Sequence, residues 1–80
     1  MTKAWQKFLQ KLELKYRENL EIILLKIMKK DFSDLDIKPV SGKKGFFRCR
    51  AGKIRIIYSY RNEIIIIEDI GFRGDIYKGF

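Results

Sequence analysis

The sequence contains no histidine, and among its 80 residues it has a single cysteine, Cys49, and a single proline, Pro39. One cysteine cannot close an internal disulfide, which is typical of proteins from a reducing compartment, so we expect a cytoplasmic protein. The lack of histidine, the one cysteine and the scattered acids predict no metal site and no cofactor. The longest apolar runs are far shorter than a bilayer-spanning helix requires, so no membrane partner is expected.

Basic residues outnumber acidic residues in this chain. Its lysines and arginines number 18 against 10 acids, giving a net charge of +8, and 46% of the residues are apolar. That apolar share is enough for the core of one small domain, which we expect to span residues 1–80. The charge favours an anionic partner, most simply a nucleic acid. Membrane-surface peptides are also basic, but they are usually isolated helices, whereas the second half of this chain is rich in strand formers.

Helical periodicity predicts a helical hairpin over about residues 2–30, with a break near 13–15 and Thr2 as the first N-cap. The residues expected to face the core are Ala4, Trp5, Phe8, Leu9 and Leu12 in the first helix and Tyr16, Leu20, Ile23, Leu24 and Ile27 in the second. Ile22 and Leu25 point away from that side. Scattered apolar residues are common on protein surfaces, and this is the favoured interpretation of the two positions. The alternative is that they form a small apolar contact site for a segment of a partner protein.

Residues 31–45, DFSDLDIKPVSGKKG, are predicted to form a turn and a solvated loop. Phe32, Leu35 and Ile37 are expected to reach the core while the aspartates stay exposed. The aspartate spacing does not match a calcium-binding loop. Lys43 and Lys44 are candidates for a basic rim next to the following strand.

Three strands are predicted at about 45–51, 54–60 and 63–70, with turns at Gly52-Lys53 and Arg61-Asn62. Together with the helices they indicate an α+β fold with a small antiparallel sheet over about 45–70 and a short C-terminal tail. The third strand is apolar on both sides, which is typical of a strand buried on both faces. Gly71 is expected to end it.

Four arginines accompany these strands. Alternation places Arg48 and Arg50 on one face, a tight hairpin would bring Arg55 to the same face, and Arg73 follows the third strand. Arginine forks match phosphate oxygens, and Lys43, Lys44 and Lys53 would extend such a phosphate-binding surface. A cluster that only keeps the sheet soluble and protects its edges explains these residues equally well.

Without histidine, RNA cleavage by a histidine pair is excluded. Arginines can still stabilise the charge that develops on the phosphate, and Tyr77 can exchange a proton if nearby cations lower its pKa. An external scaffold would then have to hold the RNA in line for attack.

Two segments, GFFRCRAGKIRIIY at 45–58 and IGFRGDIY at 70–77, resemble the RelE/ParE toxins of type II toxin–antitoxin modules, and the resemblance extends over nearly the whole chain. It implies a microbial RNase-like fold, a helical hairpin on a curved antiparallel sheet of three or four strands. For the RelE-like branch it implies a ribosome-dependent mRNA endoribonuclease, with ribosome, mRNA and an antitoxin as partners. The matching positions are catalytic Arg55, Arg73 and Tyr77, RNA-binding Arg48 and Arg50, and antitoxin-binding Ile22 and Leu25.

The chain also departs from that family. Many relatives carry histidine where Phe72 stands, and the Arg48–Arg50 pair is lysine in the best-known RelE proteins. The family opens with a β-strand, whereas this chain starts almost directly at the first helix, so we expect either a truncated start or the loss of that strand, which would leave a sheet edge open. Two other functions stay open: a ParE-like inhibitor of DNA gyrase, and an inactive relative that only binds its antitoxin.

Overall fold

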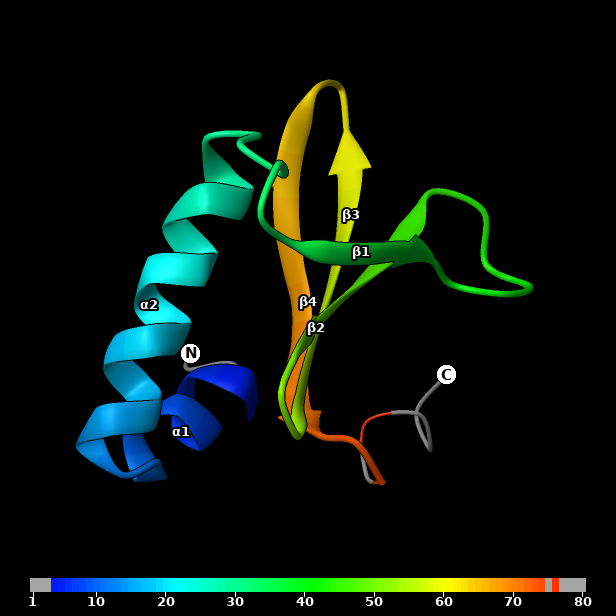
Figure 1. Ribbon diagram of the computed structural model, residues 1–80. Helices are drawn as coiled ribbons and strands as arrows, with labels where there is room; N and C mark the ends of the chain where they lie inside the picture. Colours follow the sequence, from blue (N-terminus) through cyan, green and yellow to red (C-terminus); the bar gives the residue numbers. More distant parts are fainter. Residues whose placement is uncertain (1–3, 75, 77–80) are drawn as a thin grey trace.

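In the part of the chain that the structure describes, two helices precede four strands, and both helices lie on one side of the sheet (Figure 1). The computed structural model describes residues 4–74 and 76. The elements are α1 (Ala4–Lys11), α2 (Leu14–Met28), β1 (Asp36–Pro39), β2 (Phe46–Ala51), β3 (Ile54–Arg61) and β4 (Ile64–Phe72). The strands form one antiparallel sheet in the order β1-β2-β3-β4. The predicted α+β architecture is therefore confirmed, with four strands.

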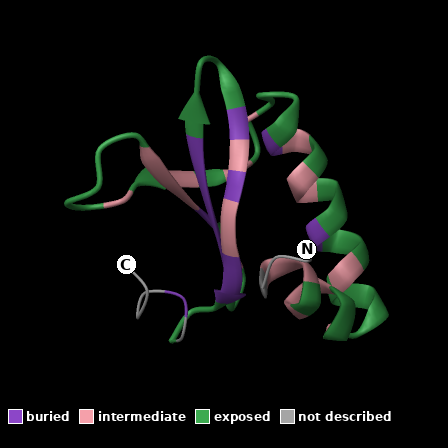
Figure 2. Ribbon diagram, turned by 180° about the vertical axis from the view of Figure 1, so that it is seen from behind, coloured by how far each residue is buried: buried purple, intermediate pink, exposed green. Residues whose placement is uncertain are grey.

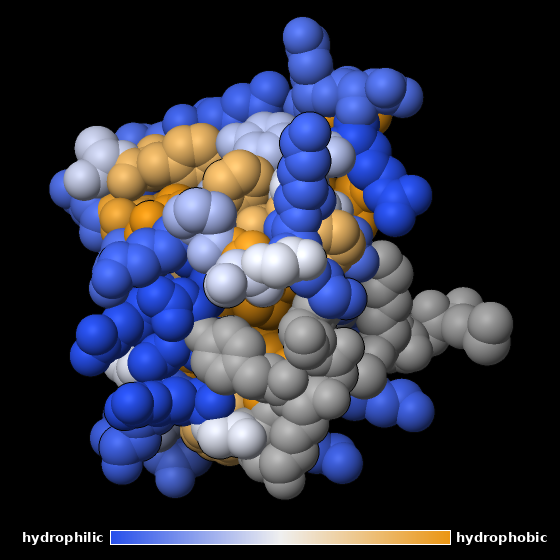
Figure 3. All heavy atoms as spheres, turned by 90° about the vertical axis from the view of Figure 1, so that its right-hand side faces the viewer, coloured by the Kyte–Doolittle hydropathy of each residue, from blue (hydrophilic) through white to orange (hydrophobic). Residues whose placement is uncertain are grey.

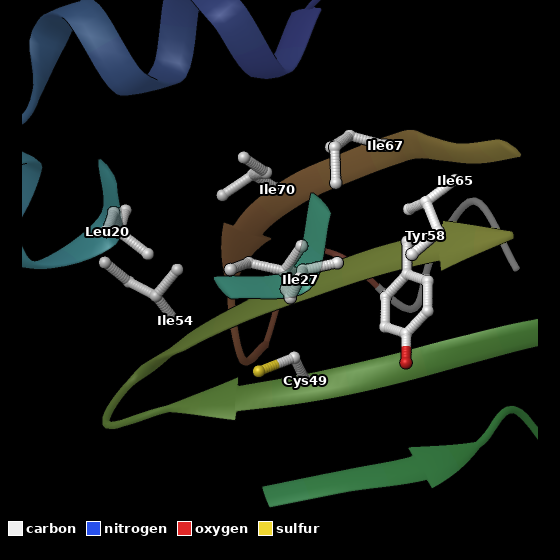
Figure 4. Close-up of a cluster of buried hydrophobic side chains, with 9 residues drawn as sticks. Leu20, Ile27, Cys49, Ile54, Tyr58, Ile65, Ile67 and Ile70 are labelled. Carbon is white, nitrogen blue, oxygen red and sulfur yellow. The ribbon is translucent and has the colours of Figure 1, made fainter. Parts of the chain in front are cut away.

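The core lies between α2 and the helix-facing side of the sheet. Leu20 and Ile27, two helical turns apart, point from α2 toward Cys49, Ile54 and the neighbouring strand residues (Figure 4). The apolar residues of α1 pack against the edge of this cluster, as predicted. Among the described residues, no helix is long and apolar enough to cross a membrane.

Tyr16, which the helical pattern placed on the core side, is largely exposed instead. It lies in the first turn of α2, where the chain has just reversed direction after α1. The Nζ atom of Lys15 lies 5.0 Å from the centre of the Tyr16 ring. The prediction was wrong because Tyr16 lines an open groove with Leu12, Ile54 and Phe72 and is not part of the core cluster.

Tight turns set the sheet register. Gly52 has a φ of 62° in the turn between β2 and β3, and Asn62 and Glu63 have φ values of 51° and 69° between β3 and β4. Two consecutive positive φ values are the geometry of a two-residue hairpin turn, which matches the strand twist. The second turn thus lies one residue later than predicted, and β4 begins at Ile64 rather than at Glu63.

The segment predicted as a solvated loop contains β1, which pairs with β2. Its aspartates are exposed and Phe32, Leu35 and Ile37 pack against the core, as expected. The strand forms because Ile37 aligns with buried Cys49. Pro39 is tolerated because it is the last residue of an edge strand, where its missing N–H costs no ladder hydrogen bond.

β4 is an edge strand and is not buried on both sides, contrary to the prediction. Ile64 is exposed at its start, and buried residues alternate with half-buried ones along β4, whereas they follow one another along most of β3 (Figure 2). The strand also continues through Gly71, which pairs with Arg55. A Cβ added at Gly71 would lie 3.6 Å from the Cβ of Ile76, so the chain after β4 folds back against this residue.

Two buried acids make stability sensitive to high pH. Burial, with a smaller effect of the Asp36 carboxylate, raises the pKa of the Cys49 thiol from 9.0 to about 11. Burial first, then Tyr60 and Cys49, raises the pKa of Tyr58 from 10.0 to about 12. Both groups hold their protons more tightly in the folded state, so their contribution to stability is complete below pH 9 and is lost as the pH rises through 11 and 12.

We therefore expect the free energy of unfolding to fall above pH ~9, by up to about 1.4 kcal/mol per pH unit for each group. Urea unfolding between about pH 8 and pH 11 measures this fall. The Cys49→Ala variant should lose the part of this decrease in stability that begins near pH 9, because it has no thiol at position 49. A wild-type stability that is flat over this range would contradict the assignment.

Candidate functional site

The face of the sheet that points away from the helices gathers most of the predicted site residues. Paired residues of antiparallel strands direct their side chains to the same face. The register aligns one row of Lys38, Arg48, Ile57 and Asp69, and a second row of Asp36, Arg50, Arg55 and Gly71. The residues between these rows, such as Cys49 and Ile56, pack under the helices. We call the surface made by the two rows, with Phe46, Ser59, Ile66 and Glu68, the distal face.

Arg48 and Arg50 lie on the distal face two residues apart in β2, which places their Cα atoms about 7 Å from each other. Arg50 is paired directly with Arg55 of β3, so the hairpin brings the three arginines together as expected. Arg48 is half-buried and Arg50 is exposed. Both are in a position to contact an anion, and their role in RNA binding stays a prediction.

Arg55 differs from its neighbours because it is only 4% exposed. Its Nη1 donates to the backbone oxygens of Gly52, at 2.6 Å, and Ile54, at 3.1 Å. Its buried Nε has no hydrogen-bond partner among the described residues. Arg55 thus holds the β2–β3 turn, and in this conformation its positive charge reaches a ligand through space rather than by direct contact.

Arg73 is exposed just after β4, next to the β2–β3 turn. Its backbone N–H donates to the backbone oxygen of Lys53 at 2.8 Å, which fixes the chain there while leaving the side chain outside the core. Arg73 therefore lies at the end of the distal face that carries Arg50 and Arg55. Tyr77, the predicted proton-exchanging residue, lies outside the described residues.

The predicted lysines lie at the two ends of β2. Lys43 and Lys44 are exposed in the loop before it, and the Nζ atom of Lys43 lies 5.9 Å from the centre of the Phe46 ring. Lys53 is exposed in the turn after it. Positive charge therefore extends along the whole length of β2, a distance of about 20 Å between the lysine ends.

Two carboxylates on the distal face were not predicted as site residues. The Ser59 hydroxyl donates to Glu68 Oε1 at 2.6 Å, and the backbone N–H of Ile70 donates to Asp69 Oδ1 at 2.9 Å. The β3–β4 register shifts between Ile57 and Tyr58, and this bulge leaves Glu68 unpaired. A pair of acids that interrupts an isoleucine run was the sequence signal for these groups.

The surface of the distal side shows how these charges are arranged. In Figure 3, apolar atoms form a strip across the upper part of this side and hydrophilic atoms border it. Of the apolar residues that the register places on the distal face, Phe46 and Ile66 are half-buried and reach the surface, whereas Ile57 is fully buried. An apolar floor with charged borders suits a ligand that combines flat bases with phosphates.

Phe72, which replaces the histidine of many relatives, lies on the opposite side of the sheet. Its ring packs edge-on against Phe8 of α1, with 5.1 Å between the ring centres. It lines a groove of about 800 Å³ with Leu12, Tyr16 and Ile54. In this conformation, then, residue 72 is not next to the arginines of the distal face.

The remaining predictions concern metal ligands and the antitoxin. Within residues 4–74 and 76, no group of three or more Cys, Asp or Glu side chains is placed to hold a metal ion. Ile22 and Leu25 are 55% and 59% exposed on the outer side of α2. They are accessible to a partner, and their assignment to an antitoxin stays a prediction.

Comparison with known proteins identifies the family. A family model described as "ParE toxin of type II toxin-antitoxin system, parDE" matches residues 1–77. The chain belongs to this family. It is a toxin of a type II toxin–antitoxin system within the RelE/ParE group, as its sequence resemblance suggested.

The fold of this toxin is also similar to that of a solved relative. The crystal structure of a RelB-RelE antitoxin–toxin complex from Methanococcus jannaschii contains a chain that is 25% identical, with a TM-score of 0.80. The match covers 99% of this toxin and 95% of that chain. The comparison with curated proteins found no match.

Proposed function

We propose that this toxin is an mRNA endoribonuclease that acts in the cytoplasm on messages held by the ribosome. The observation that carries the proposal is the distal face, where Arg48 lies two strands from the acidic pair Glu68 and Asp69. Phe46 and Ile66 supply apolar surface there, and Arg50 and Arg73 extend the positive charge toward the β2–β3 turn. A basic surface with an apolar floor supports RNA over a small ligand. A carboxylate among arginines supports chemistry in addition to binding.

The proposed reaction is attack by a ribose 2′-hydroxyl on the neighbouring phosphorus. A base takes the 2′-hydroxyl proton, the new O–P bond forms, and the bond from phosphorus to the 5′-oxygen breaks, leaving a 2′,3′-cyclic phosphate. The 5′-oxygen receives a proton as it leaves. Arginine cannot exchange protons at neutral pH, so Arg48, Arg50 and Arg73 serve to neutralise the charge of the transition state.

Glu68 is the proposed base. Asp69, its neighbour in β4, lies two strands from Arg48 in the same row, so about 10 Å separates their backbones. An extended arginine side chain is long enough to cover most of that distance. One phosphodiester can therefore contact arginine while its ribose approaches the carboxylate. Tyr77 is the proposed proton donor to the leaving oxygen.

We include the ribosome because the toxin has few groups that can exchange protons with the RNA. With no histidine, the acid–base chemistry rests on one carboxylate and one phenol. An ordered substrate compensates for weak acid–base groups, since fixed geometry removes much of the entropic barrier. The antitoxin partner is supported by the RelB-RelE complex to which this toxin is similar.

We expect the purified toxin to cut a message in a translating cell-free extract and to leave the same naked RNA intact. Primer extension locates the cuts, and DNA supercoiling by gyrase is measured in parallel. The Glu68→Gln variant keeps the side-chain size and an acceptor for Ser59, and it should slow cutting at least about tenfold.

Each other outcome has a defined meaning. Intact messages with inhibited gyrase would replace the proposal with a ParE-like function, which the description of the matched family favours. Intact messages with active gyrase would indicate a relative that only binds its antitoxin. Cutting by Glu68→Gln at the wild-type rate would eliminate Glu68 as the base while leaving the nuclease assignment in place.

A further inference from the structure

The outer side of α2 carries a line of residues in which an acid and a base stand at the two ends and two apolar residues stand between them. Glu18, Ile22 and Leu25 of α2 and Lys29, its C-cap residue, are separated by four, three and four residues, the spacing of one continuous line along a helix. All four are exposed. The line therefore runs from an acid, through two large apolar side chains, to a base. We call it the outer line of α2.

Apolar exposure on this side extends beyond the line itself. Leu14 and Met28 are also largely exposed and lie next to the outer line on the helix surface. The other side of the same helix buries Leu20 and Ile27 in the core. A helix that is apolar on both sides within a small domain is typical of one whose second side is covered by another chain.

We propose that the outer line of α2 is a self-association surface that takes a second copy of this toxin in antiparallel orientation. When two such lines meet around a twofold axis, Glu18 of each copy faces Lys29 of the other. Ile22 of each copy then faces Leu25 of the other. A twofold interface requires a surface that is its own complement, and the order of these four residues satisfies that requirement.

Charge complementarity favours a second copy over an antitoxin segment, the occupant that the sequence predicts for Ile22 and Leu25. An antitoxin would have to present a base, two apolar residues and an acid in the reversed order. A second copy of this toxin, lying antiparallel, has that order in its own α2. The inference goes beyond the proposed nuclease function, because the outer line is on the helix side and the distal face stays open in such a dimer (Figure 1).

The contact is small and each copy has a net charge of +8, so the dimer should be weak. Sedimentation velocity on the full-length toxin from about 5 μM to about 500 μM covers the range in which a weak dimer dissociates. We expect a reversible monomer–dimer equilibrium. Leu25→Asp, at an exposed position, should weaken it at least about tenfold. The same variant should lower the ratio of folded to unfolded toxin by no more than about fivefold, or about 1 kcal/mol, through helix propensity and the helix dipole.

A charge exchange provides the decisive measurement. Glu18→Lys and Lys29→Glu should each weaken self-association, because each places like charges opposite one another twice. Mixed in equal amounts, the two variants should form a mixed dimer, since each then meets the opposite charge at both ends. The matched control is a mixture of Glu63→Lys and Lys7→Glu, which changes net charge equally but away from α2, and each of these variants should self-associate like the wild type.

Three results would overturn the inference. One is a wild-type toxin that stays monomeric throughout the concentration range. Another is a dimer that Leu25→Asp leaves unchanged, which would place the contact elsewhere. The third is a mixture of the two α2 variants that associates no better than either variant alone; if Leu25→Asp then also abolished antitoxin binding, the outer line would be assigned to the antitoxin.

Discussion

Arg73→Ala is expected to lower the rate of ribosome-dependent message cutting by roughly 10²–10³, the usual effect of removing one group that stabilises transition-state charge. The physical reason is the position of its side chain, which is exposed at the end of the distal face next to the β2–β3 turn. Melting temperature should change little, because the contact that fixes residue 73 is a backbone N–H donated to Lys53. Alanine retains that hydrogen bond. Single-turnover cutting rates test the expected loss of activity, and thermal unfolding of the same samples tests the expected retention of stability.

Arg17→Ala is the matched control. Arg17 is an arginine of α2, on the helix side of the molecule, so the variant changes the net charge equally without touching the distal face. If both variants slowed cutting to the same extent, the loss would reflect total charge and not the position of Arg73. If Arg73→Ala cut at the wild-type rate, Arg73 would be removed from the proposed catalytic set.

The arrangement of the arginines follows from elements that sequence periodicity resolves well. Alternation in β2 and β3 separates Arg48, Arg50 and Arg55 from Cys49 and Ile56 by face, because the side-chain period of a strand is two residues. A two-residue turn at Gly52 then leaves a single register for the hairpin. The convergence of three arginines was predictable for these two reasons.

The burial of Arg55 was not predictable in the same way. Its guanidinium is held by the carbonyl groups of Gly52 and Ile54. Such side-chain to backbone contacts depend on turn geometry that residue types do not specify. A sequence pattern therefore assigns Arg55 the same exposure as Arg50, although the two paired residues differ greatly in solvent access.

β1 and Glu68 show two further limits of a periodic pattern. β1 has four residues, ends in proline and directs only Ile37 into the core, so no alternation of useful length exists. Glu68 lies at a bulge, where one extra residue breaks the period of two and shifts the side chains that follow. Both features arise from pairing with a neighbouring strand, which local sequence does not encode.

The largest stability effect is expected at the centre of the sheet. Ile56 of β3 is 0% exposed and is paired with Cys49 on one side and Ile70 on the other. Ile56→Ala should lower the free energy of unfolding by about 2–5 kcal/mol, from lost apolar burial and the cavity that remains. A chain of this size has a total stability of only about 4–12 kcal/mol, so the variant should be close to unfolding at physiological temperature.

Ile64→Ala is the matched control, since it makes the same substitution in the same sheet at a position that is 64% exposed. It should cost less than about 1 kcal/mol, mainly through β-propensity. Urea unfolding of the two variants, fitted with a common slope, gives the comparison. Equal costs at the two positions would mean that residue 56 is not packed in the core, and the helix-facing side assigned to β3 would be wrong. The opposite assignment of Arg55 to the distal face depends on the same alternation, so this measurement also tests the geometry on which the proposed nuclease site rests.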